Sequence, residues 1–159
     1  MKALILYDST YGNTEKVAQA MAKAMPSIYQ VDVLPLKDTH ITDIITSDLI
    51  IVGSPTQAGR PTVALQHYLA NLPTNVLGGI RVAAFDTRFE PANHGFWLRK
   101  LMRFIGFAAN PIAKLLQSKH GTLVVPPEGF IVQDKTGPLK QGELKRAEFW
   151  AKDVAQHYS

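Results

Sequence analysis

The chain has 159 residues, of which 46% are hydrophobic and 19% charged, a composition typical of a folded domain and not of a disordered chain. It contains no cysteine, which excludes disulfides, thiolate nucleophiles and cysteine-bound iron–sulfur or zinc sites. The net charge is +4, and no apolar stretch approaches the roughly 18 residues of a membrane span. We expect a cytoplasmic protein, and the lack of linkers and repeats predicts that residues 1–159 form a single domain.

Five short apolar runs, each bounded by turn residues, predict five strands. They cover residues 3–7, 31–34, 49–52, 82–85 and 123–125. The first, third and fourth runs are apolar throughout, which is typical of parallel strands that helices cover on both faces. In the second run, Val31 and Val33 alternate with polar residues, so this strand is expected nearer an edge of the sheet.

Helical periodicity fills the segments between these runs. Apolar residues recur at helical spacing in 17–25, after Pro61, after Pro111 and in 144–154, and a short helix fits near 41–46. The stripes consist of Val17, Met21 and Met25; Leu65, Leu69 and Leu72; Ile112, Leu115 and Leu116; and Leu144, Ala147, Ala151 and Val154. Strand and helix alternate along the chain, which predicts an α/β fold with a doubly wound parallel sheet in three layers. Ligands of such sheets bind beyond the carboxyl ends of the strands.

The segment that follows the first strand is a candidate phosphate site. It reads Ser9-Thr10-Tyr11-Gly12-Asn13-Thr14, and a helix is expected to begin near Asn13. Free backbone N–H groups and the positive end of the helix dipole would face this loop, so it could bind phosphate without Lys or Arg. The alternative is an ordinary turn with a helix N-cap. The glycine motifs of dinucleotide folds and of nucleotide triphosphatases are both absent.

Three loops together resemble those of the flavodoxin family. Residues 9–14 are similar to its phosphate loop, [ST]-x-[TY]-G-N-T. Residues 53–61, Gly-Ser-Pro-Thr-Gln-Ala-Gly-Arg-Pro, resemble the family's G-[ST]-P-x-x-x-G stretch beside the flavin ring, and 85–89 lie where its other ring loop is found. Residues 126–130 and 137–139 look similar to one bacterial branch of flavodoxin-like proteins. The resemblance implies a five-stranded sheet with strand order 2-1-3-4-5.

The same resemblance implies an FMN cofactor and assigns its contacts. The phosphate would be held by Ser9, Thr10, Tyr11, Asn13 and Thr14, with Gly12 allowing the backbone to turn closely around it. The ribityl chain would lie along Ser54, Pro55 and Thr56. One edge of the ring would pass Gln57, Ala58 and Gly59, and its other side would pass Asp86, Thr87, Arg88 and Phe89.

Two features differ from the usual flavodoxin pattern. The second loop contains no aromatic residue, so one ring face is expected to be open, or covered by Trp97 or another subunit. The chain is basic, and residues 91–127 contain no Asp or Glu, so a redox partner is expected to present an acidic docking face. The basic, amphipathic segment 96–105 is expected to pack on the sheet; a membrane-surface contact or a lid over the flavin are the alternatives.

The expected function is therefore an FMN-binding protein that transfers electrons through its flavin. One alternative is an FMN-dependent NAD(P)H:quinone or flavin reductase, which would use a small quinone-like acceptor. The other is a flavodoxin-like interaction module that no longer binds FMN. No catalytic residue, metal ligand or nucleic-acid partner is predicted, although His94 could act near the flavin. A receiver domain is excluded, because the Asp after the third strand and the Lys after the fifth strand that it requires are missing. A hydrolase with a nucleophile elbow is excluded, because G-x-S-x-G is absent.

Overall fold

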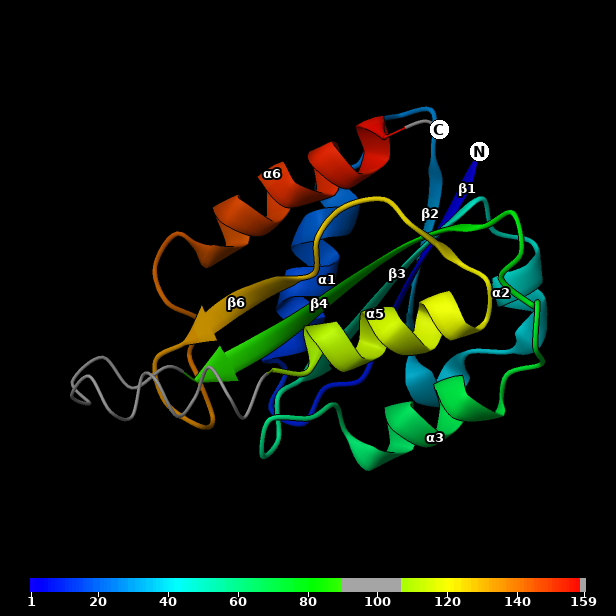
Figure 1. Ribbon diagram of the computed structural model, residues 1–159. Helices are drawn as coiled ribbons and strands as arrows, with labels where there is room; N and C mark the ends of the chain where they lie inside the picture. Colours follow the sequence, from blue (N-terminus) through cyan, green and yellow to red (C-terminus); the bar gives the residue numbers. More distant parts are fainter. Residues whose placement is uncertain (90–106, 158–159) are drawn as a thin grey trace.

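The computed structural model describes residues 1–89 and 107–157 (Figure 1). The described elements are β1 (Lys2–Tyr7), α1 (Asn13–Ala24), β2 (Gln30–Pro35), a 3-10 turn (Leu36–Asp38), α2 (Ile41–Ile45), β3 (Leu49–Pro55), α3 (Val63–Asn71), β4 (Arg81–Phe89), α5 (Ala109–Ser118), β5 (Thr122–Leu123), β6 (Glu128–Val132) and α6 (Glu143–Gln156). The predictions for His94, Trp97 and the segment 96–105 lie outside the described residues. No helix in the described part of the chain is long and apolar enough to cross a membrane.

The sheet is parallel and has the order β2-β1-β3-β4-β5, which confirms the predicted α/β fold and strand order. A further strand, β6, also pairs with β4 in parallel. The order reverses direction between β1 and β3, because β2 lies on one side of β1 and all later strands lie on the other. In sheets of this kind, such a switch point opens a crevice at the carboxyl ends of the strands.

The fifth position of the sheet is divided between two strands. β5 pairs with the beginning of β4, and β6 pairs with its second half along the same edge. Residues 123–125 were predicted as one strand, but β5 ends at Leu123 and pairing resumes at Glu128. Pro126 and Pro127 lie in the interruption, and proline cannot donate a hydrogen bond to a sheet ladder.

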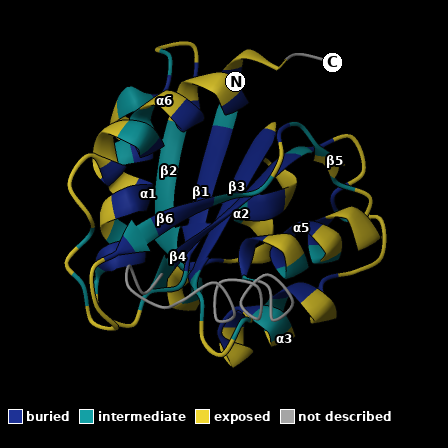
Figure 2. Cartoon of the chain, turned by 60° about the vertical axis from the view of Figure 1, so that its left-hand side comes forward, coloured by how far each residue is buried: buried dark blue, intermediate teal, exposed yellow. Residues whose placement is uncertain are grey.

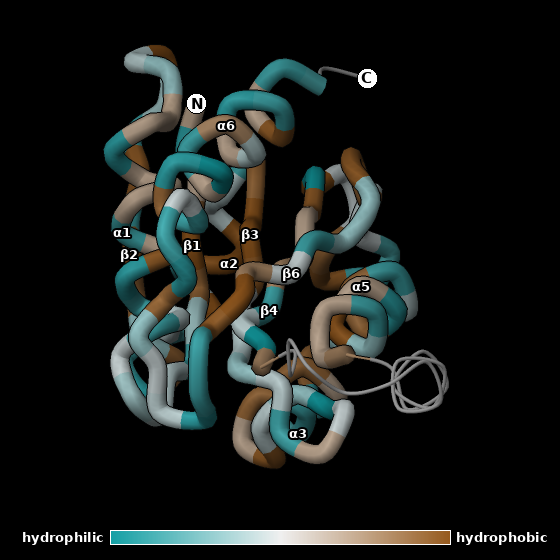
Figure 3. Tube along the Cα trace, turned by 90° about the vertical axis from the view of Figure 1, so that its left-hand side faces the viewer, coloured by the Kyte–Doolittle hydropathy of each residue, from teal (hydrophilic) through white to brown (hydrophobic). Residues whose placement is uncertain are grey.

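Helices cover the sheet on both faces and complete three layers (Figures 1 and 2). Ala3 and Ile5 of β1 pack in one core with α1 and α6, while Leu4 and Leu6 pack in the other with α2, α3 and α5. The alternation of side chains along a strand therefore explains why this run is apolar throughout. Figure 3 shows β1 and β3 as hydrophobic segments in the middle of the fold.

The helices follow the predicted stripes with two differences. α5 begins at Ala109, before Pro111, because proline is tolerated in a first helical turn where its missing N–H has no partner to lose. On α6, Leu144 is 41% exposed, and Trp150 is buried in the stripe with Ala147 instead. Trp150 makes edge-to-face contacts with rings on β4 and β6, with centroids 6.3 Å apart in each pair.

Replacement of Gly53 with alanine should destabilise the fold. Gly53 pairs with Phe85 on the neighbouring strand, and an added Cβ would lie 2.1 Å from Cζ of this fully buried ring. Overpacking of this kind costs roughly 1–3 kcal/mol. We expect a lower midpoint in urea denaturation monitored by circular dichroism. Gly78→Ala is the control, because its Cβ would meet only a backbone oxygen at 3.2 Å, and equal losses in both variants would contradict the explanation.

Candidate functional site

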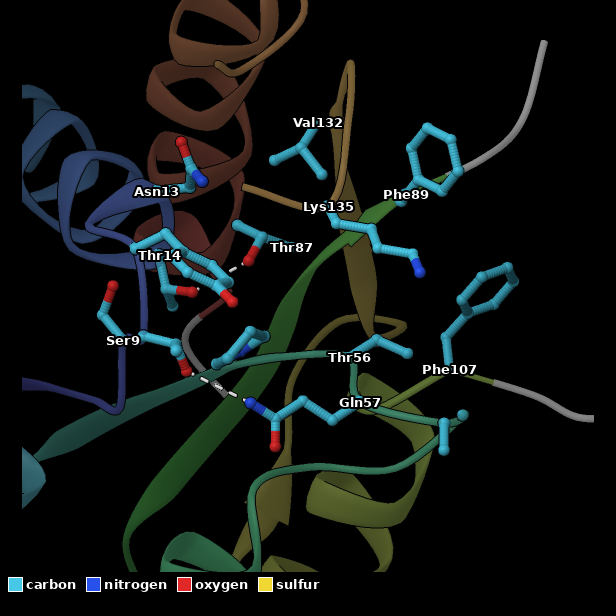
Figure 4. A pocket seen from close by; sticks show the side chains of 15 residues that line it. Ser9, Asn13, Thr14, Thr56, Gln57, Thr87, Phe89, Phe107, Val132 and Lys135 are labelled. Carbon is cyan, nitrogen blue, oxygen red and sulfur yellow. Dashed lines mark hydrogen bonds between the residues drawn. The ribbon is translucent and has the colours of Figure 1, made fainter. Parts of the chain in front are cut away.

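A pocket of about 440 Å³ lies at the carboxyl ends of β1, β3, β4 and β6 (Figure 4). It is lined by Ser9, Thr10, Tyr11, Asn13, Thr14, Pro55, Thr56, Gln57, Ala58, Gly59, Thr87, Phe89, Phe107, Val132 and Lys135. All three segments predicted from the sequence contribute to this lining, but residues 85–89 are not a loop: they belong to β4, which continues to Phe89 because β6 pairs with this part of it. Four residues that were predicted to contact the cofactor are outside it, namely Gly12, Ser54, Asp86 and Arg88.

The first loop forms the amino-terminal end of α1. Gly12 is the N-cap residue of α1 and has a φ of 83°. Because glycine has no side chain that could accept a hydrogen bond, the N–H groups of the first helical turn face this end of the pocket without a capping side chain. The Gly12 N–H itself donates to Oγ of Ser9 at 3.1 Å, which closes the loop. Oγ1 of buried Thr14 is 2.8 Å from Oγ1 of Thr87. Hydroxyl groups and helix N–H groups thus converge at one end of the pocket, where they can hold an anion.

The second loop is a tight turn that is tied to both neighbours. Gln57 and Arg60 exchange two backbone hydrogen bonds, at 2.8 and 3.0 Å, around Ala58 and Gly59. Both central residues have positive φ, 49° and 78°, the left-handed conformation that two-residue turns of this type require. Nε2 of Gln57 donates to Oγ1 of Thr10 at 3.1 Å, and Figure 4 draws this hydrogen bond as a dashed line from Gln57. The first two loops therefore share one wall of the pocket.

Ser54 supports the second loop from behind. Its side chain is fully buried, its hydroxyl donates to the Pro55 carbonyl at 2.9 Å, and it accepts from the Thr62 N–H at 3.0 Å. Thr62 caps α3 by accepting from Leu65 and donates its hydroxyl to Asp8 at 2.5 Å. These bonds fix the ends of β1 and β3 relative to α3.

Asp86 and Arg88, both on β4, pair with each other. Both carboxylate oxygens of Asp86 accept from Arg88, from Nε and Nη2, at 2.7 Å each. The Asp86 carboxylate also accepts from the Ala109 N–H at 2.8 Å, at the beginning of α5. Burial raises the pKa of Asp86 above its ordinary value, while the hydrogen bonds and charge of Arg88 act in the opposite direction.

Three lining residues were not predicted from the sequence: Phe107, Val132 and Lys135. Val132 and Lys135 come from β6 and the turn after it, and this turn contacts the first loop through a bond from Nδ2 of Asn13 to the Thr136 carbonyl, 3.0 Å long. The apolar run after Glu128 is a strand signal that could have located Val132. No local signal distinguishes Phe107, because its approach to the pocket depends on how α5 packs.

The two ends of the pocket differ in chemistry. Ser9, Thr14 and the α1 terminus form a polar end, while Phe89 and Phe107 lie at the other end beside Lys135 (Figure 4). Among the described lining residues, Lys135 is the one with a charged side chain. Within residues 1–89 and 107–157, no group of His, Asp or Glu side chains could hold a metal ion. The pocket suits an elongated ligand with an anion at one end and a flat apolar ring at the other.

A doubly wound parallel sheet with the strand order 2-1-3-4-5 defines the flavodoxin-like class of fold. The flavodoxin family model matches residues 5–86, slightly more than half of the chain, and the chain belongs to the flavodoxin family. This family assignment implies a flavin cofactor.

Solved structures support the fold. Oxidised flavodoxin 1 from Bacillus cereus superposes with a TM-score of 0.78 at 16% identity, and the alignment covers 100% of both chains. A flavodoxin from the domain Archaea has a TM-score of 0.75 at 22% identity, covering 98% of this chain and 97% of that one. Rubredoxin oxygen:oxidoreductase from Desulfovibrio gigas matches 98% of this chain with 35% of its own, at 18% identity and a TM-score of 0.73. No curated protein sequence matches the chain.

Proposed function

We propose that residues 1–159 form a single cytoplasmic domain that binds FMN and transfers electrons through it. The observation that carries this proposal is the pocket with two different ends. An uncapped helix terminus with the hydroxyls of Ser9 and Thr14 lies at one end, and Phe89 and Phe107 lie at the other. FMN has this distribution of groups, with a phosphate joined by a ribityl chain to a flat ring.

The residues divide by the part of FMN that they would hold. Ser9, Thr10, Asn13 and Thr14, with the N–H groups of α1, would bind the phosphate. Pro55, Thr56 and Thr87 would border the ribityl chain, and Gln57, Ala58, Gly59 and Phe89 would border the ring. Bound FMN supplies the redox chemistry, while the protein supplies binding, orientation and the electrostatic surroundings.

Charge near the pocket supports an acidic partner. Lys135 lines the pocket, and Arg60 is exposed in the turn of the second loop. A donor or acceptor protein with carboxylates on its docking face would be attracted to these cations and oriented by them. The interaction should therefore weaken as the salt concentration rises.

A reductase is the second candidate function. In the second loop, Ala58 carries only a methyl group and Gly59 no side chain, at positions where an aromatic residue would cover the flavin. An uncovered ring face would admit NAD(P)H or a quinone directly. An interaction module without FMN has no comparable support, because the hydroxyls and the uncapped helix terminus that would bind the phosphate all lie at one end of the pocket.

An anaerobic titration of the FMN-loaded protein separates these functions. We expect the protein to retain FMN, and the visible absorption of the flavin to persist when NADPH or NADH is the sole reductant. A reductase protein with its own nicotinamide supply should then bleach the flavin. Direct bleaching by NAD(P)H would instead establish the reductase, and failure to retain FMN would contradict both.

A further inference from the structure

Phe107 lies two residues before the beginning of α5 and lines the pocket, and an arginine stacks on its ring. Cζ of Arg88 lies 3.7 Å from the centroid of the Phe107 ring. A guanidinium this close to a ring face makes a cation–π contact. One face of Phe107 is therefore occupied by the protein, and Phe107 contributes its remaining surface to the pocket lining, beside Phe89 and Lys135 in Figure 4.

The guanidinium is bound by Asp86 and packs closely against Gly129. Asp86, whose side chain is fully buried, accepts two parallel hydrogen bonds from it, and this geometry fixes the plane of the group. Gly129 of β6 lies against it, since a Cβ there would be 2.1 Å from Cζ of Arg88. Only a residue without a side chain leaves room for Arg88 in this place.

The backbone that follows Phe107 is fixed by the same elements. The Ala108 N–H donates to Oγ1 of Thr56 at 2.9 Å, and the Ala109 N–H donates to Asp86 at 2.8 Å. Thr56 itself lines the pocket. Phe107 is thus attached through its ring to Arg88, and through the next two residues to the second loop and to β4.

We propose that Asp86 and Arg88 are positioning residues, which hold Phe107 as an aromatic wall against the flat ring of the bound ligand. The inference rests on the proposed function, in which that ligand is FMN. It gives the two residues a role other than direct contact with FMN. It also supplies an aromatic contact that the second loop, without an aromatic side chain, does not provide.

The first test replaces Phe107 with leucine and measures binding of FMN and of riboflavin by the full chain. Loss of an aromatic contact should weaken both ligands by the same factor, about threefold to tenfold. Phe107→Tyr should restore the affinity, and Phe149→Leu, at an exposed position on α6, is the matched control. Unchanged affinity in Phe107→Leu would overturn the proposal. A wild-type protein that binds neither ligand would instead refute the proposed function on which it rests.

The second test measures position and not affinity. Tryptophan in contact with a flavin ring quenches its fluorescence, so Phe107→Trp should shorten the fluorescence lifetime of bound FMN, whereas Phe149→Trp should not. Adding Arg88→Lys to Phe107→Trp keeps the charge but removes the planar, two-pronged contact, and it should lengthen and broaden the lifetimes. Identical lifetimes in Phe107→Trp with and without Arg88→Lys would overturn the positioning role. If the double variant does not fold, the single variants are sufficient: equal lifetimes of bound FMN in Phe107→Trp and Phe149→Trp would overturn the proposal.

Discussion

Replacement of Arg88 with alanine should lower the free energy of unfolding by about 3–5 kcal/mol at neutral pH. The Asp86 carboxylate is fully buried, and Arg88 supplies its counter-charge through two hydrogen bonds of 2.7 Å. Without the guanidinium, the carboxylate stays buried with no opposite charge beside it. Phe107 also loses the group that stacks on it. Urea denaturation of the FMN-free protein, monitored by circular dichroism, measures the loss.

The loss should become smaller as the pH falls. Burial raises the pKa of Asp86 and Arg88 opposes this effect, so the pKa should rise further in the variant. A carboxyl whose pKa is raised by folding stabilises the folded protein at a pH below its unfolded pKa, about 3.9, and this stability is lost as the pH rises through the folded-state pKa. At low pH Asp86 is protonated and neutral, so the missing charge of Arg88 costs less. The double variant Asp86→Asn/Arg88→Met should lose less than Arg88→Ala, and an equal loss would show that ion pairing is not the cause.

Replacement of Thr14 with valine should weaken FMN binding about tenfold to a hundredfold. A hydrogen bond to a charged group contributes roughly 1.5–3 kcal/mol, and valine keeps the shape of threonine while removing its hydroxyl. Thr14 is 1% exposed, lies in the first turn of α1, and has its Oγ1 2.8 Å from that of Thr87. We expect riboflavin, which lacks the phosphate, to bind the variant as it binds the wild type. Fluorescence titration with each ligand gives the two affinities.

The matched control is Thr42→Val, which alters an exposed threonine on α2 outside the pocket lining. It should change neither affinity. An equal loss of riboflavin binding in Thr14→Val would indicate damage to the pocket as a whole. FMN affinity equal to that of the wild type would remove Thr14 from the phosphate site.

Much of the fold could be predicted because its signals are local. A run such as residues 3–7 is apolar on both faces of its strand, and this implies helices on both sides of the sheet. The interruption between β5 and β6 was missed, although Pro126 and Pro127 stand in it. Both β5 and β6 pair with β4, and β6 contains Gly129, which weakens the sequence signal of a strand.

The candidate site could be predicted only in part. The first and second loops are continuous segments, so residues such as Thr14 and Gln57 could be chosen from their motifs, and both line the pocket. Phe107 and Lys135 could not be chosen in this way. Asp86 and Arg88 were chosen as contacts of the cofactor, and that assignment stays a prediction, while the structure pairs them outside the lining.

The sequence by itself determined the alternation of strands and helices and the position of the phosphate loop, because periodicity and turn chemistry act over a few residues. Only the tertiary structure decided that Phe107, Val132 and Lys135 share the pocket with the first and second loops. Phe107 lies far along the chain from Thr56, but the next residue, Ala108, donates its N–H to Thr56. The two segments meet because α5 begins against β4, where Asp86 accepts a hydrogen bond from the first N–H group of the helix. Contacts of this kind arise from packing between distant segments, and no local pattern in the sequence records them.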